Sequence, residues 1–273
     1  MNNAIKLPVF GVDTHAHIFC KGLPLAGTRR YAPDYDATVE AYLENLRRSG
    51  LSHGVLVQPS FLGTDNSYMF DALKRHPDQL RGIAVVSPDV SEAELEAMND
   101  CGVVGARLNL VGLPLQDYAS EPWVGLFGKL KKLDWQLEIH RQCQDLAVIM
   151  PPILASGINL VLDHFGRPDP VLGAKDPAFQ ALLASANTGR VWVKLSGTYR
   201  NQSSLAEAVA MTAMLRQAFG TDHLLWGSDW PHTQFETATN HASEYALIDH
   251  LLPDPSDRQR VLVETPTALF RFK

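Results

Sequence analysis

Eight short apolar segments recur along the chain, and each is followed by a stretch with helical periodicity. The apolar segments lie at residues 9–12, 54–58, 80–86, 103–109, 136–140, 159–164, 191–195 and 224–226. Runs of Val, Leu and Ile of this length are typical of strands that are buried on both faces, as in a parallel sheet. Strands that alternate with helices at a spacing of about 25 to 35 residues predict repeated βαβ units.

Helical periodicity and capping signals occupy the intervals between these segments. The expected helices cover residues 36–49, 66–76, 122–133, 146–155, 179–186, 205–219, 245–252 and 256–264, and a further helix is expected to begin at Ser91. Asp36 is expected to cap the first helix, Ser91 and Glu94 form a capping box, and Pro122 stands in the first turn of its helix. Eight strand–helix units within about 250 residues predict a (β/α)8 barrel of the TIM type, an α/β fold.

A doubly wound open sheet is the alternative for alternating strands and helices. The barrel is favoured because no glycine-rich phosphate loop follows the first strand, and because polar residues stand at the C-terminal end of nearly every strand. The chain has 273 residues, 45% of them hydrophobic, which is enough to bury one core of this size. No internal repeat or linker divides it, so residues 1–273 are expected to form a single domain.

Charge and cysteine content exclude several classes of function. A formal charge of −6 and a pI near 5.9 argue against general binding to nucleic acid or to anionic membranes. The three cysteines show no C-x-x-C spacing, which argues against a disulfide framework and a structural zinc site. No apolar run is long enough for a membrane span or a signal peptide. We therefore expect a cytoplasmic protein that acts on a small molecule, with its oligomeric state open.

Two distant segments carry the residues best suited to catalysis. In Val12-Asp-Thr-His-Ala-His17, the two histidines stand two residues apart at a strand end, so both side chains point to the same face. In Leu224-Leu-Trp-Gly-Ser-Asp-Trp-Pro-His232, a buried strand delivers Asp229 at its C-terminal end. The C-terminal ends of barrel strands meet on one face, which predicts a cluster of His15, His17 and Asp229.

Other polar residues also fall at predicted strand ends. They are Gln58, Ser60, Arg107, Asn109, His140, Arg141, His164, Arg167, Lys194, Ser196, Arg200 and His232. A carboxylate among histidines can take a proton from water while the imidazoles, or a metal they bind, polarise a carbonyl, and this pattern indicates hydrolysis. Arg107, Arg167 and Arg200 are candidates to bind a carboxylate of the substrate, because a guanidinium matches a carboxylate in two parallel hydrogen bonds.

Three of these segments resemble motifs of the amidohydrolase superfamily. They are Val12-Asp-Thr-His-Ala-His17, Val161-Leu-Asp-His-Phe-Gly-Arg-Pro168 and Leu225-Trp-Gly-Ser-Asp-Trp-Pro-His232. More narrowly, they resemble amidohydrolase-related family 2 and its branch that contains 2-pyrone-4,6-dicarboxylate lactonase and related lactone hydrolases. The similarity runs from about Val12 to the C-terminus and includes residues 65–66 and 103–109.

The resemblance implies a distorted barrel in which Asp229 activates water against a lactone carbonyl. It implies that His15, His17 and His164 line that carbonyl as further catalytic residues. The substrate-binding residues that it implies are Arg107, Arg200, Tyr31, Ser60, His140, Arg167 and His232. Tyr31 belongs to the polar loop 21–36, which is long enough to cover a site. Because the pyrone lactonase works without a bound metal, the resemblance implies no required cofactor.

Two positions depart from the lactonase pattern. That pattern has a further arginine near Leu113, where this chain reads Leu110-Val-Gly-Leu-Pro114, and the recognition of a second carboxylate is therefore left open. The fifth strand ends in His140, where the lactonase has a tyrosine and metal-dependent members of the superfamily have a ligand histidine. His15, His17, His140 and Asp229 would then form a site for one divalent metal, Zn or Mn.

The expected function is hydrolysis of the lactone ring of a small carboxylated substrate, for example 2-pyrone-4,6-dicarboxylate in the breakdown of aromatic compounds. Three alternatives stay open. A metal-dependent decarboxylase is favoured by His140 and would release carbon dioxide. A hydrolase of sugar lactones would leave some arginines without an anionic partner. A barrel that binds a carboxylated ligand without turnover is disfavoured, because the histidine set and Asp229 are all present.

Overall fold

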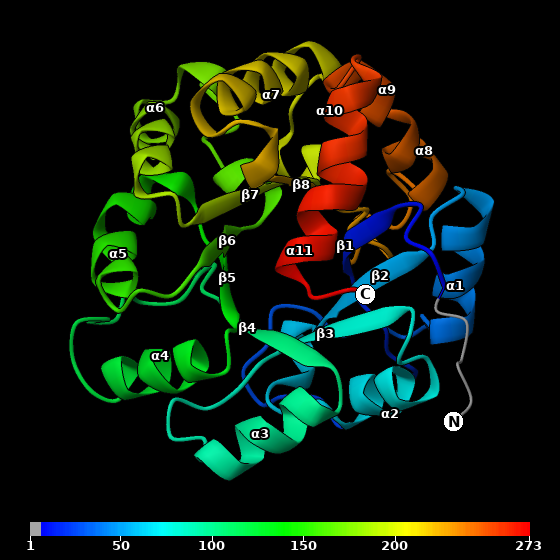
Figure 1. Cartoon of the computed structure of the whole chain (residues 1–273), viewed down its shortest axis with the longest axis vertical. Coiled ribbons are helices and arrows are strands. Elements are labelled where there is room, and N and C mark those ends of the chain that lie inside the picture. Colours follow the sequence, from blue (N-terminus) through cyan, green and yellow to red (C-terminus); the bar gives the residue numbers. More distant parts are fainter. Residues whose placement is uncertain (1–6) are drawn as a thin grey trace.

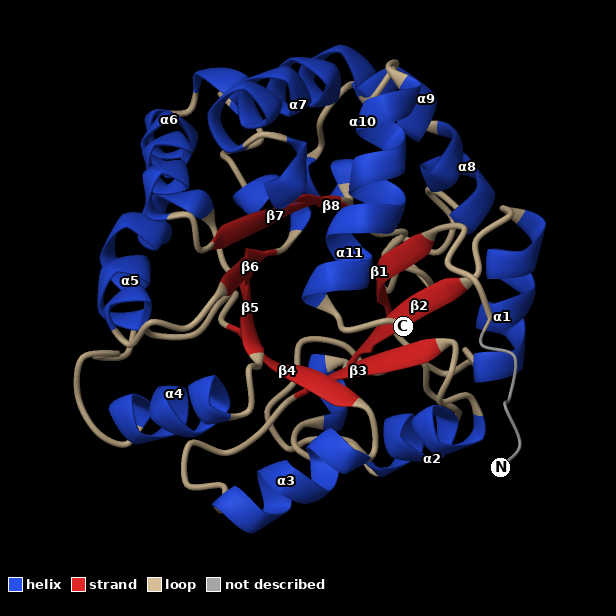
Figure 2. Ribbon diagram, viewed as in Figure 1, coloured by secondary structure: helices blue, strands red, loops and turns tan. Residues whose placement is uncertain are grey.

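The computed structural model describes residues 7–273, which form an eight-stranded barrel with helices on its outside (Figures 1 and 2). All strand pairs are parallel and follow the order of the sequence, so the predicted (β/α)8 barrel is confirmed and the open-sheet alternative is wrong. The strands are β1 Val12–Ala16, β2 His53–Val57, β3 Leu80–Ala84, β4 Val103–Asn109, β5 Gln136–His140, β6 Leu160–Leu162, β7 Val191–Leu195 and β8 Leu224–Trp226.

Seven helices follow the first seven strands in turn, and four shorter helices follow β8. The first seven are α1 Val39–Arg48, α2 Ser67–Arg75, α3 Glu92–Asp100, α4 Trp123–Lys132, α5 Cys143–Ala155, α6 Pro177–Leu183 and α7 Leu205–Phe219. The last four are α8 His241–Ala246, α9 Ile248–Leu251, α10 Pro255–Gln259 and α11 Thr265–Leu269, with a π-helical turn, Arg260–Glu264, between α10 and α11. Each long helix turns an apolar face to the sheet, as α1 does with Val39, Tyr42 and Leu46.

The predicted helix starts are confirmed in part. The capping box of Ser91 and Glu94 is present at α3. The expected cap of α1 is wrong, because Thr38 caps this helix while the Asp36 carboxylate accepts a hydrogen bond from the Lys21 backbone N–H. Asp36 instead closes the base of the loop 21–36, next to the backbone pair of Phe19 and Ala37. Both residues can cap a helix, and the competing contact decided between them.

The first strand also begins later than expected. The apolar run 9–12 lies mostly before β1, and the strand itself contains His15. Within residues 7–273, β1 and β8 form no regular strand pair, and Ala16 makes an isolated parallel bridge with Trp230. Instead the Thr14 hydroxyl donates to the carbonyl of Trp226 (2.8 Å), and the His17 backbone N–H donates to the carbonyl of Trp230 (2.7 Å). These bonds close the barrel at the two segments that carry the catalytic candidates.

The C-terminal segment closes the opposite end of the barrel. Phe270 and Phe272 pack with interior side chains such as Val55 and Ile83, and the Phe272 ring lies against His53 at the start of β2 (4.8 Å). Figure 1 shows α11 and the C-terminus lying over the ring of strands. The barrel interior is thus filled at the N-terminal ends of the strands, and the C-terminal ends are left for a site.

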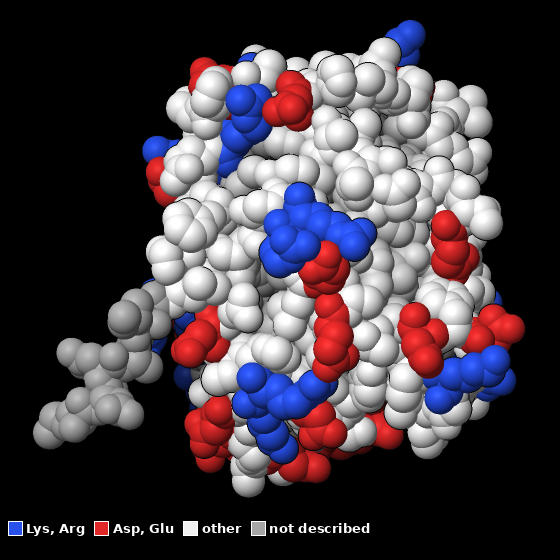
Figure 3. Space-filling model, turned by 90° about the vertical axis from the view of Figure 1, so that its right-hand side faces the viewer, with Lys and Arg blue, Asp and Glu red and all other residues white. Residues whose placement is uncertain are grey.

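The surface carries mixed charge. On the face that Figure 3 shows, Lys and Arg side chains lie beside Asp and Glu side chains, and most of the area is uncharged. None of the helices within residues 7–273 has both the length and the apolar character that a membrane crossing requires.

Candidate active site

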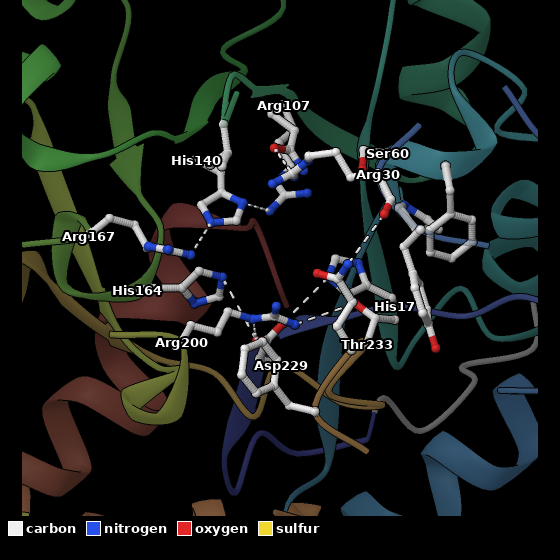
Figure 4. Close-up of a pocket in the computed structure, with 17 residues that line it drawn as sticks. His17, Arg30, Ser60, Arg107, His140, His164, Arg167, Arg200, Asp229 and Thr233 are labelled. Atoms are coloured by element: carbon white, nitrogen blue, oxygen red, sulfur yellow. Dashed lines mark hydrogen bonds and ion pairs between the residues drawn. The ribbon is translucent and has the colours of Figure 1, made fainter. Parts of the chain in front are cut away.

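A cavity of about 180 Å³ opens at the C-terminal ends of the strands. It is lined by His17, Arg30, Tyr31, Pro59, Ser60, Phe61, Arg107, Asn109, Val111, His140, His164, Arg167, Arg200, Asp229, Thr233, Gln234 and Phe235. Figure 4 shows Asp229 and His17 on one side of this cavity and Arg107 and His140 on the other. The structure therefore brings together most of the residues that the sequence predicted.

Asp229 stands in a sharp turn after β8 and is fully buried. Its backbone is left-handed (φ 59°), and its N–H donates to the carbonyl of His15 (2.8 Å). Gly227 allows this close approach, because a Cβ at this position would lie 2.6 Å from the Cβ of His15. His164 and Arg167 are left-handed too (φ 52° and 55°), so backbone strain is concentrated in the turns that carry the site.

The two carboxylate oxygens of Asp229 have different surroundings. Oδ2 accepts hydrogen bonds from the Tyr199 hydroxyl (2.6 Å) and from Nε of Arg200. Oδ1 has no hydrogen-bond partner within residues 7–273 and faces Nε2 of His15 (3.7 Å) and of His17 (3.6 Å). Burial alone would raise the pKa of Asp229, but the Arg200 guanidinium and the nearby imidazoles hold it well below its usual range. Asp229 is therefore a charged group with one free oxygen.

The three neighbouring histidines are fixed by different partners. The Nδ1 of His17 lies 2.7 Å from the carbonyl of Val57, which can only accept, so Nδ1 carries a proton and, in a neutral ring, Nε2 is bare. The Nδ1 of His15 lies 3.0 Å from the Lys194 ammonium and 3.2 Å from Oδ1 of Asp163, so this nitrogen is held from below while Nε2 faces Asp229. Burial lowers the pKa of His164 to about 3, and burial followed by the charge of Lys194 lowers that of His15, so both rings are neutral near pH 7.

A second layer of charges lies under these histidines in the barrel interior. Lys194 contacts Glu138 (2.7 Å) and Asp163 (3.5 Å), and all three side chains are fully buried. Burial would raise the pKa of Asp163, but His15, Arg107 and Lys194 lower it well below its usual range. The network holds the ring of His15 from below and the guanidinium of Arg107 from the side.

Asp13 joins the two catalytic segments. Its carboxylate accepts hydrogen bonds from the Ser228 hydroxyl (2.6 Å), the Ser228 backbone N–H (2.8 Å) and the His15 backbone N–H (3.1 Å). This buried side chain therefore sets the backbone of His15 and the residue before Asp229 at the same time. Its partner Ser228 therefore has a structural role.

Four arginines line the cavity, and only two of them have a carboxylate partner within residues 7–273. Arg107 pairs with Asp163 (2.9 Å), and Arg200 pairs with Asp229. The other two contact neutral groups. Arg167 lies 3.2 Å from Nε2 of His140, and Arg30 donates to the amide oxygen of Asn109 (3.0 Å). The cavity therefore carries an excess of positive charge.

The metal-ligand set predicted with His140 is not assembled. His15, His17 and Asp229 are close enough to hold one metal ion, and the unpartnered atoms Nε2 of His15 and Oδ1 of Asp229 fit such an ion. His140 lies outside this group, because Arg107 and Arg167 each place a guanidinium 3.2 Å from one of its ring nitrogens. Burial and the charges of these arginines lower the pKa of His140. The contacts with the two arginines, and not the position at the strand end, hold the ring in its direction.

The loop 21–36 covers one side of the cavity, as expected from its length. The hydroxyls of Tyr31 and Tyr35 both donate to Oε1 of Glu236 (2.5 and 2.7 Å), which lies in the long segment after β8. Tyr31 thus lines the cavity while its hydroxyl bonds to Glu236. Tyr35, Glu236 and this bridge between two loops had no signal in the sequence, since neither loop has a regular period.

Some residues lie elsewhere than predicted or were missed. His232 does not line the cavity. It lies behind Asp229 on a separate groove with His241, where burial lowers its pKa to about 4. Tyr199 and Arg30 belong to the site without having been predicted, although each is adjacent in sequence to a predicted residue. Asn109 and Lys194 were noted at strand ends without a role, and the structure gives both of them partners in or under the cavity.

Comparison with known proteins agrees with this geometry. A family profile described as amidohydrolase matches residues 12–272. The chain is 32% identical to a 2-pyrone-4,6-dicarboxylate hydrolase of Comamonas testosteroni, over 97% of this chain and 91% of that protein. It is 29% identical to a 4-sulfomuconolactone hydrolase of Hydrogenophaga intermedia, over 97% of this chain and 89% of that protein.

A solved structure confirms the fold at high similarity. It is a Pseudomonas putida protein described as a 2-pyrone-4,6-dicarboxylic acid hydrolase, and it superposes with a TM-score of 0.93 at 44% identity. The alignment covers 98% of this chain and 99% of that one. The resemblance seen in the three motifs thus extends along the whole barrel. The chain belongs to the amidohydrolase family, in the branch that contains the pyrone dicarboxylate hydrolases.

Proposed function

We propose that the protein is a hydrolase that opens the ring of a small anionic lactone, with 2-pyrone-4,6-dicarboxylate as the first substrate to test. The observation that carries this proposal is the free Oδ1 of Asp229, which faces two histidines at the base of a cavity rich in arginine. The hydrolases named above act on lactones that bear acidic groups, and this agrees with the charge of the cavity. The two arginines without a carboxylate partner favour an anionic lactone over an uncharged sugar lactone.

Asp229 would act as the general base. A water molecule between Oδ1 of Asp229 and the bare Nε2 of His17 can donate one hydrogen to each, which directs its lone pair at a carbonyl above. Asp229 takes one proton as the water oxygen bonds to the carbonyl carbon. The carbonyl oxygen becomes negative, and we assign its stabilisation to the ring of His164, which lines the cavity and packs against the buried ring of His15.

The lactone ring opens after the water has added to the carbonyl carbon. The bond between the carbonyl carbon and the ring oxygen breaks, and the proton held by Asp229 passes to that oxygen. The product is a hydroxy acid or its keto tautomer. Arg200 would act in two ways, since it pairs with Asp229 in this structure and lines the cavity beside Arg167. A substrate carboxylate that takes up Arg200 weakens its pair with Asp229 and makes Asp229 a stronger base.

A divalent metal fits the same three side chains. His15, His17 and Asp229 would hold it, and a bound metal would polarise the lactone carbonyl as a Lewis acid. The metal content of protein purified without chelator, and the rate of hydrolysis before and after chelation, decide whether it takes part. A cytoplasmic site of action is also proposed, supported by three free cysteines, which suit a reducing compartment.

The substitution Asp229→Asn tests the role of Asp229. It keeps the size of the side chain and removes the base, so the rate of pyrone ring opening should fall by about a thousandfold or more. Binding of the lactone, measured by calorimetry, should be kept or become tighter, because the cavity arginines remain and Arg200 loses its carboxylate partner. The matched control is Asp100→Asn, an exposed aspartate at the end of α3, which should hydrolyse the lactone at the unmodified rate. An Asp229→Asn protein that keeps its turnover would contradict the mechanism.

A further inference from the structure

The charge balance of the cavity differs between its two sides. On the Asp229 side, the pair with Arg200 cancels one positive charge. Asn109 lies at the end of β4, and in an eight-stranded barrel this position is across the opening from β8, which leads to Asp229. On the Asn109 side, Arg107 is paired with Asp163, but Arg30 has only the amide oxygen of Asn109 as a partner in the described part of the chain.

Arg30 reaches this side from the covering loop. Figure 4 shows its side chain extending from the Ser60 side toward Arg107. Burial lowers the pKa of Arg30, and the charges of Arg107 and Arg200 lower it further, so Arg30 adds a cation to a region that is already positive. An anion bound between these cations reduces their mutual repulsion.

Asn109 completes a binding position for an anion. Asn109 lines the cavity, and its Oδ1 accepts from Arg30, which leaves the two hydrogens of Nδ2 available as donors. The segment 110–114 that follows Asn109 reads Leu-Val-Gly-Leu-Pro and supplies no cation. Arg30 therefore supplies the unpaired positive charge on this side, although it comes from a loop far away in the sequence.

The covering loop is held in a way that keeps Arg30 in place. Tyr31, the next residue, and Tyr35 both bond to Glu236, and the amide of Gln234 donates to the carbonyl of Arg30 (3.4 Å). These contacts anchor the backbone beside Arg30 on the segment after β8. An arginine on an anchored loop loses less side-chain and backbone freedom when it binds an anion.

We propose that Arg30, with Nδ2 of Asn109, binds an acidic substituent of the lactone remote from the carbonyl under attack, so that Arg30 selects dianionic lactones over monoanionic ones. The proposal deepens the proposed function and rests on it for the identity of the substrate. The acidic substituent is a carboxylate or a sulfonate, since both accept hydrogen bonds from a guanidinium and an amide. Arg167 and Arg200 remain for the acidic group nearer to Asp229.

The test compares Arg30→Gln with Arg29→Gln. Arg29 is the adjacent arginine of the same loop, does not line the cavity, and donates to the carbonyl of Ala26 (2.8 Å). The substrates are 2-pyrone-4,6-dicarboxylate and its two monocarboxylates, 2-pyrone-4-carboxylate and 2-pyrone-6-carboxylate. For Arg30→Gln, the ratio of kcat/KM for the dicarboxylate to that for one of the monocarboxylates should fall by about tenfold or more, mainly through KM. Arg29→Gln should keep the ratio of the unmodified protein.

A binding measurement separates failure of this proposal from failure of the proposed function. Pyridine-2,4-dicarboxylate and the two pyridine monocarboxylates carry the same acidic groups on a ring that cannot be hydrolysed. The unmodified protein and Arg29→Gln should bind the dicarboxylate more tightly than either monocarboxylate, and Arg30→Gln should lose about tenfold of that preference. This result would support Arg30 even if no lactone is opened, in which case only the proposed function fails. An unchanged preference, or an equal loss for all ligands, would overturn the assignment of Arg30.

Discussion

At the residue scale, the site depends on one carboxylate whose two oxygens do different things. Oδ2 of Asp229 is bound by Tyr199 and Arg200, while Oδ1 is free to receive a proton. A buried carboxylate would ordinarily tend to be protonated, so Arg200 is what keeps Asp229 charged. The role of Asp229 as a base therefore depends on its pair with Arg200, and the pH dependence of kcat/KM measures this dependence.

The substitution Arg200→Met should move the acid limb of kcat/KM to higher pH. Without the guanidinium, burial raises the pKa of Asp229, and activity is then lost at a higher pH as protons are added. We expect the limb to rise by at least about one pH unit, since an adjacent opposite charge shifts a carboxyl pKa by about 1 to 3. The measurement is the pH profile of kcat/KM between pH 4 and 9, within the range where the protein stays folded.

The control for this profile is Arg216→Met, which removes an arginine that pairs with Asp257 on the outside of the barrel (2.6 Å). Its acid limb should coincide with that of the unmodified protein. A limb that stays in place in Arg200→Met, with only the height of the profile reduced, would mean that Arg200 binds substrate without setting the charge of Asp229.

At the element scale, the covering loop and the segment after β8 form one unit. The base of the loop is closed by Lys21 and Asp36 and by the pair of Phe19 and Ala37, and its tip is bound to Glu236 through two tyrosines. Burial would raise the pKa of Glu236, but the tyrosine hydroxyls and backbone N–H groups that bond to it lower it. A charged acceptor for two hydroxyls makes this bridge stronger than a neutral one.

The substitution Glu236→Ala should release the tip of the loop and leave its base closed. Backbone amides of residues 28–35 should exchange with deuterium about tenfold faster, since local opening then has to break fewer hydrogen bonds. The amides of Phe19 and Ala37 serve as the internal control and should keep their protection. Equal loss of protection at tip and base would indicate that the whole loop unfolds, and unchanged exchange at the tip would show that Glu236 does not hold it.

At the scale of the whole molecule, the barrel unites residues that lie far apart in the chain. Asp13 binds Ser228, the Asp229 N–H binds the carbonyl of His15, and the Phe270 and Phe272 side chains fill the other end. The free energy of unfolding also depends on buried acids outside the barrel interior, because burial makes it costly to charge them. Burial raises the pKa of Glu244, on α8, to about 7.

The substitution Glu244→Gln should stabilise the protein at pH 8 and have no effect at pH 4. The folded pKa of Glu244 is above its unfolded value, so charging this side chain costs more in the folded state, and stability is lost as pH rises toward 7. Gln keeps an acceptor for the Thr239 hydroxyl and carries no charge. The free energy of unfolding at pH 8 should rise by about 1 to 3 kcal/mol, measured by denaturant titration.

The control for this prediction is Glu96→Gln on the exposed face of α3. Its free energy of unfolding should equal that of the unmodified protein at both pH values, because a solvated carboxylate has a similar environment in the folded and unfolded states. A Glu244→Gln protein that is less stable at pH 8 would show that the charge of Glu244 is used in the fold.

The fold could be predicted because its signals are local. Eight apolar segments alternating with helices repeat one supersecondary unit, and each strand was expected near its observed place. The exceptions depend on contacts with other segments. β1 begins at Val12, where its pairing with His53 of β2 begins, and α1 begins after Thr38 since Asp36 is engaged by Lys21. Such choices between nearby residues depend on partners that are distant in the sequence.

The sequence by itself determined the (β/α)8 barrel and the residues that gather at its C-terminal face, because strand period and strand ends are set by neighbouring residues. Only the tertiary structure decided how these side chains pair. His140 could be a metal ligand by its position, but the guanidinium groups of Arg107 and Arg167 lie 3.2 Å from its two ring nitrogens. His232 follows a catalytic motif and yet faces away from the cavity, and Arg30 enters the cavity from a loop without a regular pattern. Side-chain direction and partner choice are decided by contacts across the barrel, and a linear pattern does not contain those contacts.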